Sequence, residues 1–133
     1  MAYVTKATTS GGRNGRSVLE GGVLGLAMAF PKDLGGDGAG HNPEQLFALG
    51  WSSCYCQALM LVAKKHGVDA SAAKVTCEVT LNTEGGFNLA AELKISVPGA
   101  DKDKVQAAAD EAHTVCPYSK ATKGNIPVKL TVI

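Results

Sequence analysis

The sequence has almost no net charge, because thirteen basic residues stand against twelve acidic ones and leave a formal charge of +1 over 133 residues. It lacks a basic stripe, so there is no electrostatic reason to expect nucleic acid or an anionic membrane as a partner. It also lacks internal repeats and low-complexity tracts. With 45% hydrophobic and 19% charged residues, the composition is typical of a globular protein. We therefore expect a single domain over residues 1–133.

The sequence also shows no pattern of a secretory leader. The chain starts with an alternating polar segment instead of a basic and then apolar one, so we expect no signal peptide and a cytoplasmic protein. Only four cysteines occur, and in a reducing compartment they favour thiol chemistry over permanent disulfides. Residues 45–63 carry no charge, but serine and glutamine interrupt them. A helix buried in a soluble core or between two subunits explains this stretch better than a membrane span.

Hydrophobic periodicity predicts the element order β-β-β-α-β-β-α-β. Alternating apolar and polar residues indicate six strands, which we expect at residues 3–9, 17–20, 23–29, 74–81, 87–97 and 126–132. The glycine-rich segment 31–41 needs no regular structure. Pro127 favours the edge of a sheet for the last strand.

The start of the long helix is the clearest local signal. Asn42 is a good N-cap, Pro43 suits the first helical position, and Gln45 stands three residues after the cap, as in a capping box. The helix should continue to about Lys65 and stop at Gly67. A second helix should begin after a cap at residue 101, and a short helical turn should follow residue 117.

The four cysteines differ in their settings. Cys77 lies on the apolar face of an alternating strand, and core packing explains it. Core packing also explains Cys56, which points about 200° away from Cys54 around the helix. Cys54 alone would be a poor nucleophile, because burial disfavours the thiolate. Cys116 stands directly before a proline that can open a helical turn, so Cys54 and Cys116 together suggest chemistry that neither suggests alone.

A zinc site can be considered from the three histidines and four cysteines. No C-x-x-C or H-x-x-x-H pair is present, and Cys54 and Cys56 on one helix cannot both point at a single ion. We therefore expect no metal site, and loop or surface positions for the histidines.

Three motifs in order resemble the OsmC/Ohr family, and within it the organic hydroperoxide resistance branch. They are GGRNGR (11–16), NPEQLFALGWSSC (42–54) and VCPYSKATKGNI (115–126). The resemblance spans the whole chain and agrees with the predicted element order. It implies an α+β OsmC-like fold with an antiparallel sheet, a long central helix and an intertwined homodimer that has its active sites at the subunit interface.

The same resemblance implies a thiol-dependent peroxidase that reduces organic and fatty-acid hydroperoxides to alcohols, without a bound cofactor. Cys54 would be the peroxidatic thiol and Cys116 the resolving thiol, while Arg13 and Glu44 would form the charged pair that activates the site. Dihydrolipoamide or a lipoylated protein would be the external reductant. Two departures from the family pattern are Cys56 in place of an apolar residue and Trp51 in place of tyrosine.

Elementary geometry adds a constraint. Glu44 lies about 15 Å along the helix axis from Cys54, so the two cannot easily meet within one helix. We therefore hypothesise that Arg13 and Glu44 of one subunit complete the site around Cys54 and Cys116 of the other. Without the resemblance, Glu44 would be interpreted as a helix-dipole residue and Arg13 as a solvated loop arginine.

The substrate and the class of function leave alternatives open. Apolar residues near Cys54 on the helix would suit a bulky organic peroxide better than hydrogen peroxide, although core or dimer packing explains them equally; they are Leu46, Phe47, Leu49 and Trp51. A non-catalytic redox sensor or a small-ligand binding module of OsmC type is the alternative to an enzyme. The lack of a DNA-reading element weighs against a sensor that regulates transcription.

Overall fold

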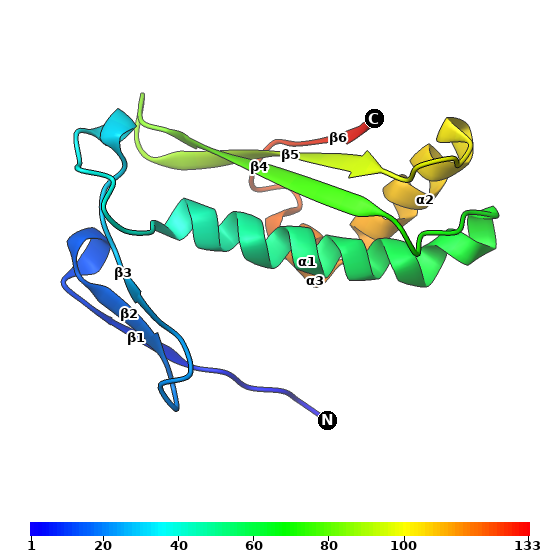
Figure 1. Cartoon of the computed structure of the whole chain (residues 1–133). Coiled ribbons are helices and arrows are strands. Elements are labelled where there is room, and N and C mark those ends of the chain that lie inside the picture. The colour runs from blue at the N-terminus through cyan, green and yellow to red at the C-terminus, as the bar shows by residue number, and fades with distance from the viewer. The chain divides into compact units, whose positions relative to one another are not determined.

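The computed structural model describes residues 1–133, and the chain divides into two compact units, Met1–Leu46 and Phe47–Ile133. Each unit contains a three-stranded sheet of its own. The long helix α1, Pro43–Ala63, begins at the end of the first unit (Figure 1). The α+β class and the predicted order of elements are confirmed.

The first unit is built on an antiparallel sheet in the order β1-β2-β3. Its strands are short, namely β1 (Ala7–Ser10), β2 (Arg16–Leu19) and β3 (Gly25–Ala27). The prediction of a strand from residue 3 is wrong at its start, because the regular pairing of β1 with β2 begins only at Ala7, the partner of Leu19 at the end of β2. The loop 31–41 also holds one regular piece, the 3-10 turn Lys32–Leu34.

The second unit contains a sheet in the order β4-β5-β6 and two further helices. Its strands are β4 (Lys74–Asn82), β5 (Asn88–Ser96) and β6 (Val128–Val132), and its helices are α2 (Lys102–Val115) and α3 (Pro117–Thr122). β6 lies at the edge, as Pro127 predicted, but it runs parallel to β5. The antiparallel pairing that the resemblance implied is therefore found between β4 and β5 but not between β5 and β6, because α2 and α3 form the long crossover that a parallel connection requires.

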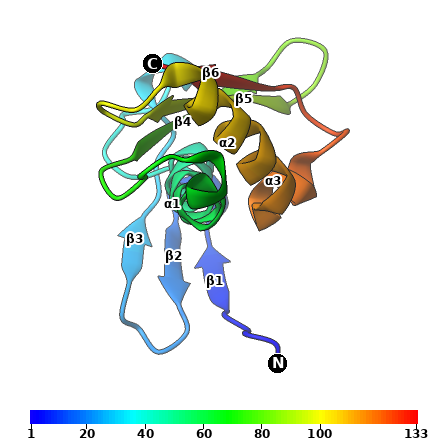
Figure 2. The same cartoon turned by 90° about the vertical axis from the view of Figure 1, so that its right-hand side faces the viewer.

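Helices α1, α2 and α3 lie on one face of this sheet (Figure 2). Trp51, Tyr55 and Leu59 of α1 are completely buried and pack with Leu93 and Ile95 of β5 in a single core. The helical segment 43–66 is long enough to span a membrane, and an 18-residue window within it has a mean hydropathy of 1.5. A core helix of a globular protein meets the same description, and a third of this window is buried in the single chain.

The predicted helix caps are confirmed. The N–H of Gln45 donates to Asn42 Oδ1 at 2.9 Å, and the N–H of Asn42 donates to Gln45 Oε1 at 3.1 Å, which completes the capping box. Asp101 accepts from two N–H groups of the first turn of α2. The chain leaves the end of α1 through the 3-10 turn 64–66 and Gly67, whose φ of 71° suits glycine.

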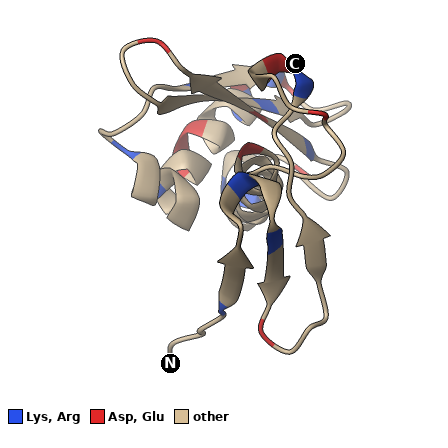
Figure 3. Cartoon of the chain, turned by 90° about the vertical axis from the view of Figure 1, so that its left-hand side faces the viewer, with Lys and Arg blue, Asp and Glu red and all other residues tan.

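Acidic and basic residues are both scattered along the chain (Figure 3). One group of ion pairs joins Glu111 of α2 to Lys65 and His66, which directly follow α1. Those two contacts hold the pKa of Glu111 below its usual value. They link α1 to α2 in the unit that carries both thiols of interest.

Candidate functional site

Arg13 sits in a tight turn that only glycine can build. The 3-10 turn Gly12–Asn14 connects β1 to β2 and carries the arginine. Gly11 has a φ of 74°, which disfavours other residues. A Cβ on Gly15 would come within 1.7 Å of the carbonyl oxygen of Ser10, so any larger residue would open the turn. The GGRNGR motif therefore presents one arginine on a turn with a fixed backbone.

Arg13 and Glu44 form a bidentate ion pair. Nη1 donates to Oε2 at 2.8 Å, and Nη2 donates to Oε1 at 2.6 Å. The guanidinium lies 6.0 Å from the ring centroid of Phe30. The hydrogen bond to Arg13 holds the pKa of Glu44 below its usual value, and the carboxylate raises the pKa of Arg13. Because two parallel hydrogen bonds fix the planar guanidinium, Glu44 orients a permanent positive charge.

Cys54 and Cys116 lie side by side. Their Sγ atoms are 3.4 Å apart, and neither sulfur is in a disulfide. Cys116 is completely buried at the junction between α2 and α3, while Cys54 is partly exposed in the middle of α1. A disulfide requires an S–S distance of about 2.05 Å, so a small movement would join them.

The surroundings within this unit do not favour a thiolate at Cys54. Burial raises the pKa of the Cys54 thiol above its ordinary value, and the neighbouring Cys116 raises it further. The backbone N–H of Tyr118 acts in the opposite direction by donating to the sulfur, but the raised pKa shows that burial prevails. No positively charged group is among the causes that shift the pKa of Cys54 in this unit.

The other two cysteines have different surroundings. Cys77 packs against the core on the buried side of β4, and burial raises its pKa to about 11, so it is a poor nucleophile. Cys56 is partly exposed and does not belong to that core, so the expectation of core packing for Cys56 is wrong. No group of His, Cys, Asp and Glu side chains is arranged to hold a metal ion.

An apolar cavity of about 300 Å³ adjoins the segment that follows Cys116. It is lined by Phe47, Leu89, Tyr118, Ala121, Thr122, Asn125 and Ile126. Of the four apolar residues considered near Cys54, Phe47 lines this cavity, Trp51 is completely buried and Leu49 is exposed. The fourth, Leu46, belongs to the first unit. The cavity has the size and lining to accept a hydrocarbon group.

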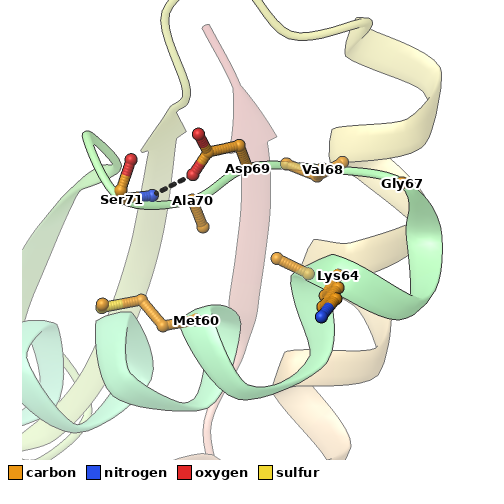
Figure 4. Close-up of a pocket in the computed structure, with 8 residues that line it drawn as sticks. Met60, Lys64, Gly67, Val68, Asp69, Ala70 and Ser71 are labelled. Carbon is orange, nitrogen blue, oxygen red and sulfur yellow. Dashed lines mark hydrogen bonds between the residues drawn. The ribbon is translucent and has the colours of Figure 1, made fainter.

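A second cavity, of about 510 Å³, lies at the other end of α1 (Figure 4). Met60 and Lys64 line one side and residues 67–71 the other. Its carboxylate, Asp69, already accepts a hydrogen bond from the N–H of Ser71. None of its lining residues is a cysteine, so it offers no thiol chemistry.

The structure thus forms two pairs from the four residues singled out in the sequence. Arg13 pairs with Glu44 in the first unit, and Cys54 pairs with Cys116 in the second. The sequence did not indicate Tyr118 as a neighbour of the thiol. Tyr118 acts on the pKa of Cys54 through its backbone N–H, which any residue except proline has, so the residue type gave no signal. Its position two residues after Cys116 was the one clue in the sequence.

Comparisons with known proteins identify the family and the fold. Residues 35–131 match the family model described as OsmC-like protein. An organic hydroperoxide resistance protein of Xanthomonas axonopodis pv. citri is 43% identical over 140 residues, which cover 99% of this chain and 95% of the relative. The crystal structure of an organic hydroperoxide resistance protein from Legionella pneumophila aligns with a TM-score of 0.90 at 40% identity and covers 99% of this chain and 98% of that one. OhrB of Bacillus subtilis aligns with a TM-score of 0.86 at 36% identity, covering 98% of both chains.

Proposed function

Because the chain belongs to the OsmC-like family, and within it to the organic hydroperoxide resistance proteins, we propose that it reduces organic hydroperoxides to alcohols with Cys54 as the peroxidatic thiol. The observation that carries the proposal is the distance of 3.4 Å between the Sγ atoms of Cys54 and Cys116. Two reduced thiols at this distance are suited to trap an oxidising equivalent as a disulfide.

The proposed reaction balances in three steps. The Cys54 thiol ionises, and its thiolate attacks the distal oxygen of the hydroperoxide and breaks the O–O bond, so that Cys54 becomes a sulfenic acid. The leaving alkoxide takes up the proton that the thiol released and departs as the alcohol. The Cys116 thiol then displaces the sulfenic oxygen, which leaves as water as the disulfide forms. An external dithiol restores both thiols by exchange and is itself oxidised. We propose dihydrolipoamide or a lipoylated protein as this reductant, and the cytoplasm as the compartment.

Arg13 is proposed to lower the pKa of Cys54 in the assembled site. The raised pKa of Cys54 supports this role, because a buried thiol needs a fixed cation to become a thiolate at neutral pH. The bidentate bond to Glu44 keeps the guanidinium oriented. Consistent with the spacing along α1, we propose that the pair is supplied to Cys54 and Cys116 by the partner subunit of a homodimer.

Exposed apolar residues on α1 support the homodimer. Leu49, Met60 and Leu61 are 67%, 48% and 68% exposed in the single chain, which is unfavourable for a helix in water. A second copy of the chain would cover them. The apolar cavity beside Tyr118 supports an organic substrate, because hydrogen peroxide has no hydrocarbon surface to bury.

A turnover assay tests the proposed function. Reduced protein is mixed with excess cumene hydroperoxide and dihydrolipoamide, and the alcohol formed is counted per protein chain. An enzyme yields many alcohols per chain, whereas a redox sensor or a ligand-binding module would stop after about one equivalent. Hydrogen peroxide in place of cumene hydroperoxide serves as the control, and it should react more slowly. A stop at one equivalent despite the dithiol would overturn the proposal.

A further inference from the structure

Three neighbouring residues of α1 contact the start of α3. The sulfur of Cys54 faces Cys116, the indole N–H of Trp51 donates to Ser119 Oγ at 3.2 Å, and Gly50 lies under the ring of Tyr118. Residues 50, 51 and 54 lie on one side of the helix, since three or four residues make a turn. These contacts form a strip along the junction of α1 and α3, and Cys116, the proposed resolving thiol, lies at one end of this strip.

The bond between Trp51 and Ser119 is the buried polar contact of this strip. Trp51 is completely buried and Ser119 is 1% exposed. An indole has one N–H and no acceptor, so Ser119 Oγ is what satisfies it. Losing the hydroxyl would leave a buried donor unpaired, which is unfavourable. The contact therefore opposes any displacement of α3 along α1.

The short α3 depends on such contacts for its position. It has six residues, which is too few for a helix to be stable alone. Gly50 has no side chain, and a Cβ there would lie 2.9 Å from the hydroxyl of Tyr118, so a larger residue would displace the Tyr118 ring from its present position. Phe47 lies beside one aromatic residue of each helix: its ring centroid is 5.4 Å from that of Trp51 in α1 and 6.1 Å from that of Tyr118 in α3.

From this geometry we infer that Trp51 and Ser119 are positioning residues for the resolving step, which hold Cys116 within reach of an oxidised Cys54. This inference rests on the proposed function of the two thiols. In the resolving step the Cys116 sulfur forms a bond to the Cys54 sulfur, the S–O bond of the sulfenic acid breaks, and water leaves with the thiol proton. A second hydroperoxide competes for the same sulfenic acid and converts it to the sulfinic acid. The hydrogen bond favours resolution in that competition.

The experiment compares Ser119→Ala with a matched loss of another buried hydrogen bond. The Tyr55 hydroxyl donates a hydrogen bond of 2.6 Å to the carbonyl oxygen of Ala109. Tyr55→Phe removes this bond, which joins α1 to α2 and not to α3. Each reduced protein is mixed with cumene hydroperoxide, quenched in acid at intervals, and analysed by peptide mass spectrometry. This separates the formation of the sulfenic acid from the formation of the disulfide, and it measures the sulfinic acid at Cys54.

We expect Ser119→Ala to slow disulfide formation about tenfold, the factor that the loss of one hydrogen bond produces. The sulfinic fraction should rise by a similar factor, while sulfenic acid should form within about twofold of the original rate. Tyr55→Phe should leave the ratio of disulfide to sulfinic acid unchanged, and Ser119→Thr, which keeps the hydroxyl, should restore most of the resolving rate. Trp51→Phe removes the donor and should resemble Ser119→Ala.

An unchanged resolving rate in both Ser119→Ala and Trp51→Phe would overturn the inference, and so would an equal loss in Tyr55→Phe, since that would indicate general destabilisation. The original protein is the reference for the proposed function. If it forms neither a sulfenic acid at Cys54 nor a disulfide, the proposed function itself fails, and the inference fails with it.

Discussion

Replacing Cys54 by serine is expected to reduce the consumption of cumene hydroperoxide by at least about 10³-fold, because an alcohol at neutral pH is a far weaker nucleophile toward a peroxide than a thiolate is. Cys116 should not substitute for it. Cys116 is completely buried, so an organic hydroperoxide cannot reach its sulfur without displacing the helices around it. The measurement is the initial rate of peroxide loss, with dihydrolipoamide present in excess.

Cys56→Ser is the matched control for this substitution. Cys56 lies two residues away on the same helix and outside the core, so serine should be tolerated there. We expect its rate to stay within about twofold of the original. A Cys54→Ser protein that still turns over, or a Cys56→Ser protein that does not, would show that the reactive thiol has been assigned to the wrong residue.

Replacing Arg13 by methionine is expected to lower the rate at pH 7 by about 10²-fold, the scale seen when one fixed electrostatic group is removed from a reaction centre. The expected change of the rate with pH follows from the pKa of the Cys54 thiol. Burial alone raises the pKa of Cys54, and Arg13 is proposed to lower it, so the variant should retain the higher pKa. Its rate should therefore increase about tenfold per pH unit on the alkaline side, until the thiol is ionised.

Arg16→Met provides a control from the same GGRNGR motif. Arg16 lies on β2, and its guanidinium packs beside Gly25 rather than beside Glu44. Its loss removes the same charge from the same unit, so the rate and its pH profile should stay close to those of the original protein. If Arg13→Met and Arg16→Met behaved alike, general electrostatics would explain the effect, and a specific role for Arg13 would be ruled out.

Local signals in the sequence predicted those parts of the fold that short-range chemistry determines. The capping box at Asn42 and Gln45, the cap at Asp101 and the alternating strands β4 and β5 each depend on residues close together in the chain. The motifs also identified both pairs of residues that the structure brings together, Arg13 with Glu44 and Cys54 with Cys116.

Features that depend on distant contacts could not be predicted in this way. The parallel pairing of β6 with β5 depends on where the crossover through α2 and α3 returns, which alternation alone does not encode. The sequence did not distinguish a position near the substrate from core packing for Trp51, which is completely buried in the core and donates to Ser119, 68 positions later. Cys56 was expected in the core of the protein, but its helix has no charged residue after Glu44 and little segregation of apolar from polar residues, so periodicity did not distinguish its buried face.

The most direct test of the account is to identify the thiols that one equivalent of an organic hydroperoxide oxidises. Fully reduced protein is treated with one equivalent of cumene hydroperoxide, the remaining thiols are blocked in acid, and the cysteine peptides are mapped by mass spectrometry. We predict one disulfide per chain, between Cys54 and Cys116, with one alcohol released and with Cys56 and Cys77 still reduced. A dominant disulfide through Cys56 or Cys77, or peroxide loss without a bond between Cys54 and Cys116, would contradict the account.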